Sequence, residues 1–221
     1  MIVTIDGPAG SGKSSTARAV AQRLGFRHLD SGAFYRALTY AALQAGIAEE
    51  RWESLDSAAL DALRVQARPG AEGWRMFAGD NDISEPIRSP QVNARVSHMA
   101  RVPAVRGWLM GRLRAAAADG DLVTDGRDMG SVVFPDARLK VYLVADPRER
   151  ARRRLAEHGH LAPGEAELAA EVARLLERDR IDSERAAAPL VQPADAVVID
   201  TTGLSFEEQV ARVVELAQRR R

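Results

Sequence analysis

Short apolar runs alternate along the chain with segments in which apolar residues recur every three or four positions. Strands are expected at four runs rich in β-branched residues: 2–6 (IVTID), 121–125 (DLVTD), 139–145 (LKVYLVA) and 195–200 (DAVVID). Helical periodicity predicts helices at about 13–24, 33–45, 55–64, 147–157, 165–187 and 205–218, the last with Ser205 as its N-cap. Strands that alternate with helices favour a parallel sheet with right-handed crossovers and helices on both faces.

The segment from Leu63 to Arg88 has a different pattern. Two Gly-rich turns separate short alternating stretches in VQARPGAEGWRMFAGDNDIS, which predicts small antiparallel strands. We interpret 63–88 as an inserted β subdomain. Helical periodicity resumes at about 91–118 and is expected to break at Pro103, because proline has no N–H to donate within a helix.

The expected sheet also predicts where a ligand binds. In parallel α/β sheets, ligands lie beyond the carboxyl ends of the strands. These ends are expected at 6–13, Asp30, 125–128 and Ala145. The functional site should therefore be assembled from segments that are far apart in the sequence.

Composition narrows the class of protein. The 221 residues include 31 Lys and Arg against 31 Asp and Glu, and this zero net charge argues against a broad nucleic-acid or membrane surface while allowing a local basic pocket. The absence of cysteine excludes disulfides and thiolate metal sites. The first residues lack a signal-peptide pattern, and no apolar stretch approaches the ~20 residues of a membrane helix. We expect a soluble, cytoplasmic protein, with a monomer as the default.

Lysine is rare, and histidine is not arranged for metal binding. Lys13 and Lys140 are the only lysines, so a lysine is expected where a compact, rotatable ammonium is needed. Among the histidines only His158 and His160 lie close together in the sequence, and we interpret this pair as facing solvent. No structural metal is therefore expected.

The sequence GPAGSGKS at 7–14 matches the phosphate-binding pattern G-x-x-x-x-G-K-[ST] completely. Its glycines let backbone N–H groups turn towards phosphate oxygens, and the following helix presents its positive N-terminus. Lys13 would neutralise the β- and γ-phosphates, and the Ser14 hydroxyl would coordinate magnesium that arrives with ATP. A Gly- and Ser-rich surface turn is the alternative, but it does not account for the strand before and the helix after. The predicted ATP-binding residues of this segment are Gly7, Pro8, Ala9, Gly10, Ser11, Gly12, Lys13, Ser14 and Ser15.

Two further motifs follow expected strand ends. In DSGAFYR (30–36), Asp30 or Ser31 can cap the next helix, and capping alone accounts for the first three residues, whereas Arg36 can point back to the site. In DGRDMG (125–130), Arg127 and Asp128 are expected at the ligand-binding edge of the sheet. A surface ion pair at a common Asp-Gly turn is the alternative for these two residues.

Two arginine-rich helices add further candidates. ERDRIDSER (177–185) places Arg178, Asp182 and Arg185 on one helix face, although a ladder of surface ion pairs has the same spacing. RERARRR (148–154) places Arg150 and Arg154 four residues apart before a flexible segment. A solvated face is the default there, but arginines entering a mobile lid also suit a developing phosphoryl charge.

This concentration of arginine favours phosphoryl transfer between two nucleotides, because two highly charged anions must be brought together. No general base is evident, and none is needed when the nucleophile is an ionised phosphate oxygen. A GTPase switch is disfavoured because no N-K-x-D sequence is present to read guanine. A nucleic-acid-dependent ATPase fits poorly with the zero net charge and the small size.

From about residue 3 to residue 216 the chain resembles the bacterial-type cytidylate kinases, which are P-loop nucleoside monophosphate kinases. The resemblance rests on the combination of LDSGAFYR, DGRDMGSVVFPDA, ERDRIDSERAAAPL and ADAVVIDTT. It implies a P-loop NTPase three-layer α/β fold with a parallel central sheet, helices on both faces, an inserted antiparallel β subdomain and a short lid. The expected domains are a core of 1–30, 90–147 and 187–221, a monophosphate-binding region of 31–89, and a lid with flanking helices at 148–186.

The resemblance also implies an activity and a set of site residues. The activity is magnesium-dependent transfer of the γ-phosphate of ATP to CMP or dCMP, which gives CDP or dCDP and ADP, with no nucleic-acid or membrane partner. The implied contacts to the acceptor's phosphate and ribose come from Ser31, Arg36, Arg127, Arg178, Asp182 and Arg185, and those to cytosine from Ser97, Arg106 and Asp128. By analogy with related kinases, Arg150 is expected near the adenine or the phosphates and Arg154 on the phosphates. The residues expected to be catalytic are Lys13, Arg36, Arg127 and Arg154.

The hydrogen-bonding pattern of cytosine supports the implied base site. Asp128 can accept from the N4 amino group but would repel the O4 of uracil, while Ser97 and Arg106 can donate to N3 and O2. Such a site discriminates strongly, because the wrong base leaves buried polar groups unpaired. The alternative is another P-loop small-molecule or nucleoside monophosphate kinase, for example one that accepts UMP.

Overall fold

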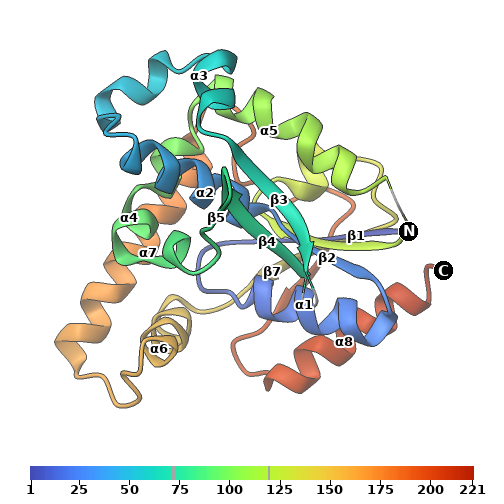
Figure 1. Cartoon of the computed structure of the whole chain (residues 1–221). Coiled ribbons are helices and arrows are strands. Elements are labelled where there is room, and N and C mark those ends of the chain that lie inside the picture. The colour runs from blue at the N-terminus through green and yellow to red at the C-terminus, as the bar shows by residue number, and fades with distance from the viewer. Residues whose placement is uncertain (71–72, 119) are drawn as a thin grey trace. The chain divides into compact units, whose positions relative to one another are not determined.

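The computed structural model describes residues 1–70, 73–118 and 120–221. They form two compact units (Figure 1), a first unit of Met1–Arg27 with Gly120–Arg221 and a second unit of His28–Asp119. Each unit is described below by itself. The functional domains expected from the sequence are a separate division, and their boundaries stay predictions.

The first unit is built on parallel strands. Its elements are β1 (Ile2–Asp6), α1 (Lys13–Leu24), β6 (Leu122–Gly126), β7 (Leu139–Val144), α6 (Pro147–Glu157), α7 (Glu165–Glu184), β8 (Val197–Asp200) and α8 (Phe206–Gln218). With β2 (Arg27–Asp30), the strands form a five-stranded sheet in the order β2-β6-β1-β7-β8. The predicted parallel sheet surrounded by helices is confirmed.

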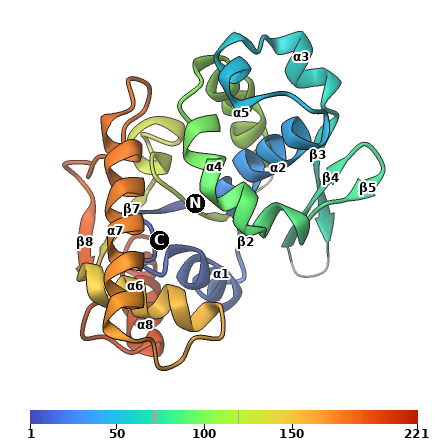
Figure 2. The same cartoon turned by 90° about the vertical axis from the view of Figure 1, so that its left-hand side faces the viewer.

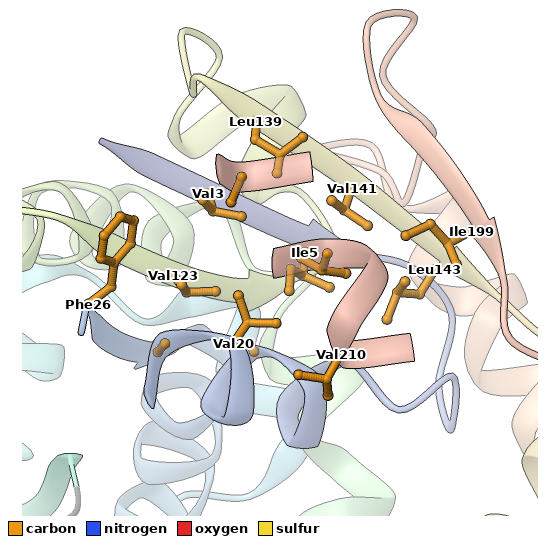
Figure 3. Close-up of a cluster of buried hydrophobic side chains, with 14 residues drawn as sticks. Val3, Ile5, Val20, Phe26, Val123, Leu139, Val141, Leu143, Ile199 and Val210 are labelled. Carbon is orange, nitrogen blue, oxygen red and sulfur yellow. The ribbon is translucent and has the colours of Figure 1, made fainter. Parts of the chain in front are cut away.

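The hydrophobic core of this unit lies between the sheet and two helices. Because side chains alternate along a strand, Val3 and Ile5 of β1 face the core, and Thr4 and Asp6 face the opposite side. The core also contains Val20 of α1 and side chains of β6, β7, β8 and α8 (Figure 3), among them Val123, Leu139, Val141, Leu143, Ile199 and Val210. Helices α1 and α8 pack side by side against it (Figure 1).

The helix ends follow from local residue types. Helix α1 begins directly after Gly12, whose φ of 85° suits a residue without a side chain. Helix α8 begins with a capping box, in which the Ser205 side chain accepts from the Glu208 N–H and Glu208 reaches back to the Ser205 N–H, as the predicted cap requires. Helix α6 has Pro147 at its start, and the Asp146 carboxylate accepts from the backbone at Arg148 and Glu149.

A second, smaller cluster joins α6 and α7 to the segment after β1. It contains Ala9, Ala151, Leu155, Leu168 and Leu175. Helices α6 and α7 lie side by side (Figure 2). The phosphate-loop segment therefore packs on the two helices that carry the candidate residues Arg150, Arg154 and Arg178.

The second unit combines helices with a small sheet. Its elements are α2 (Ser31–Gln44), α3 (Ser57–Ala62), β3 (Val65–Gly70), β4 (Gly73–Ala78), β5 (Asn81–Asp82), α4 (Pro90–Met99) and α5 (Pro103–Ala116), with 3-10 turns at Glu49–Ser54 and Pro86–Arg88. The strands form an antiparallel sheet in the order β3-β4-β5, as expected for the β subdomain. Helix α2 packs against α4 (Figure 2).

Several element ends differ from the sequence-based expectation. Helix α2 begins at Ser31 rather than at 33, because the Asp30 carboxylate caps it by accepting from the Ala33 N–H at 3.0 Å. Helix α7 ends at Glu184, three residues early, where the Asp182 carbonyl accepts from the Leu190 N–H at 2.8 Å. The π-helical turn at Met129–Val133 was not predicted. The break at Pro103 is confirmed, since this residue begins α5.

Within the described residues, no helix is both long enough and apolar enough to cross a membrane.

Replacing Ile5 by alanine is expected to destabilise the first unit. The side chain is fully buried in the core under β1, so its truncation should lower the free energy of unfolding by about 2–5 kcal/mol. Chemical denaturation followed by circular dichroism measures this change. Leu161→Ala is the matched control, because Leu161 is 84% exposed. Equal stability of the two variants would contradict the assigned core.

Candidate active site

The phosphate loop leaves the end of β1 through a glycine that no other residue can replace without strain. Gly7 has a φ of 146°, and a Cβ there would lie 2.1 Å from the carbonyl oxygen of Leu143 on β7. Gly10 and Gly12 also have positive φ, at 73° and 85°. These conformations turn the backbone of the loop and lead it into the N-terminus of α1, the arrangement that the sequence pattern predicts.

Lys13 is the first residue of α1 and is buried. Its Nζ donates to the Pro8 carbonyl oxygen at 2.5 Å and to the Ser11 Oγ at 3.3 Å. Burial lowers the pKa of the Lys13 ammonium well below its usual value, and the nearby Arg127 lowers it further, while Asp125 and Asp179 oppose the change. An incoming phosphate anion would reverse this shift by stabilising the charged form.

The Ser14 hydroxyl donates to an oxygen of Asp125, with the two atoms 2.5 Å apart. Asp125 lies in β6, within one of the segments expected to form the site, but no role was predicted for it. Its place near the end of a buried strand is the signal that could have identified it. A hydroxyl and a carboxylate side by side form the hard oxygen pair with which P-loop proteins hold Mg²⁺ beside nucleotide phosphates, so these two residues fit that ion.

Asp6 is a second carboxylate that lies at an expected strand end but for which no role was predicted. It ends β1 and is 1% exposed. Its oxygens accept from the backbone N–H groups of Met129 at 2.9 Å and Gly130 at 2.7 Å. Burial raises the pKa of Asp6 to about 6; the two N–H groups oppose this shift, and the charge of Asp128 adds to it.

The candidate residues of DGRDMG form largely buried ion pairs with Asp182 of α7 and with Arg185, which directly follows this helix instead of belonging to it as predicted. Arg127 donates through Nε to Asp182 at 2.9 Å, and Arg185 lies 3.2 Å from Asp128 with both side chains 3% exposed. Burial opposes ionisation of Asp182, but Arg127, Arg178 and Arg185 outweigh it and hold the pKa of this carboxyl below its usual value. The structure therefore brings together Arg127, Asp128, Arg178, Asp182 and Arg185, as predicted from their motifs.

The two arginines of α6 are placed differently from each other. Arg150 is buried, and its Nη1 donates to the Ala9 carbonyl oxygen at 2.9 Å and to Asp179 at 2.5 Å. The other Asp179 oxygen accepts from the Ala9 N–H at 2.8 Å. Arg154 forms an ion pair at 3.0 Å with Glu157, which is largely exposed. Asp179, which was not predicted, thus links α7 to the phosphate loop through both Ala9 and Arg150.

The remaining predicted residues lie in the second unit: Ser31, Arg36, Ser97 and Arg106. Ser31 and Ser97 are buried, and the Arg36 Nε donates to the Asn93 amide oxygen at 3.2 Å. The buried Arg106 donates to the Ala100 carbonyl oxygen at 3.2 Å.

Asp30 is a charged neighbour of these residues within the second unit. It accepts from Arg88 at 3.1 Å. Burial tends to raise the pKa of this carboxyl, but Arg36 and then Arg88 lower it to below its usual value. The structure thus adds Arg88 and Asn93 to the residues around Asp30 and Arg36 within this unit.

Comparison with known proteins gives the family. A family model described as cytidylate kinase matches residues 3–219. The chain is 43% identical over 220 residues to the cytidylate kinase of Geobacillus sp. (strain WCH70), with 99% of this chain and 96% of that protein covered. It is 41% identical over 221 residues to the cytidylate kinase of Carboxydothermus hydrogenoformans, with 100% and 98% covered. The chain belongs to the cytidylate kinase family.

This result confirms the family predicted from the motifs. The chain is a phosphotransferase of that family, and its chemistry is that of a nucleotide kinase. Among solved structures, an uncharacterised protein from Eubacterium ventriosum has a TM-score of 0.53 and 10% identity, covering 100% of this chain and 99% of that chain. That similarity concerns the fold alone, so the roles of individual residues stay predictions.

The variant Asp182→Asn is expected to lose stability in a pH-dependent way. It leaves Arg127, whose side chain is 17% exposed, without its carboxylate, which should lower the free energy of unfolding by about 3–5 kcal/mol at neutral pH. Because the pKa of Asp182 is lower in the folded than in the unfolded chain, its stabilisation is present above about pH 4 and is lost as pH falls through the folded-state pKa. Urea denaturation at several pH values measures the difference from wild type, which should narrow in acid.

Glu177→Gln on the same helix is the control. Its ion pair with Arg180 is exposed and therefore screened by solvent, so the loss should be much smaller. A difference between Asp182→Asn and wild type that stays constant with pH would contradict the ionised pair.

Proposed function

We propose that this member of the cytidylate kinase family transfers the γ-phosphate of ATP to CMP or dCMP and releases ADP with CDP or dCDP. The observation that carries the proposal is the largely buried group formed by Arg127, Asp128, Asp182 and Arg185 in the unit that also holds the phosphate loop. A protein that only hydrolysed ATP would have no use for so many charged groups held away from water, since burying each charge costs free energy.

The phosphate loop is proposed to bind the donor. Backbone N–H groups between Gly7 and Ser15 would surround its phosphates, and Lys13 would exchange the Pro8 carbonyl oxygen for a phosphate oxygen. Ser14 and Asp125 would hold Mg²⁺ that arrives with the nucleotide. When bound, the ion neutralises charge on the β- and γ-phosphates.

The acceptor phosphate is proposed to bind to arginines. Arg36 and Arg127 would hold it in line with the donor, and Arg178 and Arg185 would add positive charge near Asp182. The guanidinium groups suit this role because their planar geometry matches phosphate oxygens. No side chain needs to remove a proton, because the attacking phosphate oxygen is already ionised at neutral pH.

Asp128 is proposed to read the base. Its carboxylate would accept from the N4 amino group of cytosine, and Ser97 and Arg106 would donate to N3 and O2. Arg185 forms a buried ion pair with Asp128. Uracil would place its O4 against this carboxylate, and the resulting repulsion favours CMP over UMP.

The two arginines of α6, Arg150 and Arg154, are proposed to contact the donor phosphates. They differ in the interactions that each must break to do so. Arg154 would break a partly exposed ion pair with Glu157, which is weak because solvent screens it. Arg150 would have to leave Asp179 and the Ala9 carbonyl oxygen, to which it is bound in a buried position. Arg154 is therefore the better candidate for direct contact with the reacting phosphates. The monomeric state and the cytoplasmic location stay predictions from the sequence.

Lys13→Ala is expected to lower kcat by about 10²–10³-fold with the fold intact, because the reacting phosphates lose a buried cation. Coupled ADP release measures turnover, and circular dichroism checks the fold. Lys140→Arg is the control, since Lys140 is the other lysine of the chain and pairs with the exposed Asp195. Near-normal turnover of Lys13→Ala would overturn the assignment of the donor site.

The acceptor is tested by ADP release with ATP, magnesium and each of CMP, dCMP, UMP, AMP, GMP and shikimate. Wild type should turn over CMP and dCMP, and Asp128→Asn should lose about tenfold or more of the preference for CMP over UMP, because one discriminating contact is removed. Turnover of another acceptor by wild type would leave the kinase assignment standing and reject the proposed base site.

A further inference from the structure

Asp6 is a buried carboxylate that none of the proposed steps uses. It is the last residue of β1 and directly precedes Gly7, where the phosphate loop begins. In the sheet it pairs with Gly126 of β6 on one side and with Tyr142 of β7 on the other. A carboxylate in the middle of a sheet is costly to bury, so its hydrogen bonds indicate what it does.

Both oxygens of Asp6 are bound to two consecutive N–H groups, those of Met129 and Gly130. These residues follow Asp128 directly. The carbonyl oxygen of Asp128 accepts from the N–H groups of Val132 at 2.9 Å and Val133 at 3.1 Å. Asp6 therefore anchors the start of the turn 128–134, and the bonds within the turn connect that anchor to Asp128.

Asp128 depends on this anchor for its orientation. Its backbone has φ −144° and ψ 20°, which is neither helical nor extended. No regular hydrogen-bonding ladder holds such a residue, so the surrounding turn must do so. The direction in which Asp128 projects its carboxylate towards Arg185 follows from that backbone conformation.

The turn also lies directly on β1. A Cβ at Gly130 would come within 2.7 Å of the Thr4 Oγ1 and 3.3 Å of an Asp6 oxygen. Only glycine fits this distance, because a methyl group would push the turn away from the strand. The hydrogen bonds of Asp6 and the absence of a side chain at Gly130 thus both allow the turn 128–134 to lie close to β1.

We propose that Asp6 is a positioning residue for acceptor recognition, which holds the turn 128–134 against β1 so that Asp128 and Arg185 keep the geometry needed to read the base. This inference rests on the proposed function of Asp128. Since Asp6 also adjoins Gly7, the carboxylate holds the base-reading turn directly beside the start of the phosphate loop.

The variant Asp6→Asn tests the proposal. Asparagine keeps the size of the side chain but places an N–H₂ group against an N–H group, so one of the two hydrogen bonds is lost. We expect the KM for CMP to rise about tenfold and the preference in kcat/KM for CMP over UMP to fall about tenfold, while the KM for ATP changes less than about twofold. A role in stability alone would not separate the two substrates in this way.

Gly130→Ala displaces the same turn by steric contact and should show the same separation of the two KM values. Ser131→Ala is the matched control on this turn, because the Ser131 hydroxyl is buried and has no hydrogen-bond partner among the residues that the structure describes. It should have the KM values of wild type. Circular dichroism and thermal unfolding establish that each variant is folded.

Three outcomes of the KM measurements overturn the proposal. The first is a folded Asp6→Asn enzyme with the wild-type KM for CMP, and the second is an equal rise in the KM for CMP and for ATP, which would place the effect on the phosphate loop. If Asp6→Asn does not fold, Gly130→Ala becomes the deciding variant. The third outcome is a wild-type KM for CMP in Gly130→Ala.

Asp128→Asn, measured in parallel, separates this proposal from the proposed function. If Asp128→Asn loses the preference for CMP and Asp6→Asn retains it, the proposed role of Asp6 is rejected while the base-reading role of Asp128 stands. Retention of the preference in Asp128→Asn rejects the base-reading role itself, and with it the proposal for Asp6.

Discussion

The parallel pairing of β1 with β6 and β7 is the constraint on which the first unit depends. Its register sets Asp6 beside Gly126 and Tyr142, so the loop after β1 and the turn after β6 leave the sheet at the same edge. Because successive side chains of β1 point to opposite faces of the sheet, the two faces have different roles. Ile5 contributes to the hydrophobic core, while Asp6 binds the turn on the opposite face.

Charged side chains of 127–128 and of the segment around α7 are arranged in pairs at this edge of the sheet. Arg127 with Asp182 and Arg185 with Asp128 hold each other in place, and the desolvation cost of each charge is offset by its partner. Such groups are already oriented before a ligand arrives, so little side-chain entropy is lost on binding. Arg180 on the same helix shows the contrast, because its pairs with Glu177 and Glu184 are exposed and screened.

The phosphate loop is also held in place by residues of other elements. Both backbone groups of Ala9 are occupied, the N–H by Asp179 and the carbonyl oxygen by Arg150. These partners come from α7 and α6, which pack on Ala9 through the smaller apolar cluster. Any movement of the two helices therefore acts on the loop, because main-chain hydrogen bonds and apolar contacts connect them.

The sequence by itself determined most of the helices and strands and the residues with a local signature. The glycine and lysine pattern of 7–14 identifies the phosphate loop, since its chemistry is contained in consecutive residues, and the apolar runs predicted the parallel strands. The spacing of Arg178, Asp182 and Arg185 predicted a shared helix face but left open whether that face was a solvated ladder. Burial of Asp182 and Arg185 decides this, and burial is a property of the whole fold.

Only the tertiary structure decided the roles of Asp6, Asp125 and Asp179. Each is an isolated carboxylate whose partner lies more than a hundred residues away in the chain: Gly130, Ser14 and Ala9. The sequence placed Asp6 and Asp125 at strand ends that were expected to form the site, but it did not show which distant group each carboxylate contacts. The parallel register and the packing of α6 and α7 bring these partners together, because strand pairing and apolar burial act between segments that are distant in the sequence.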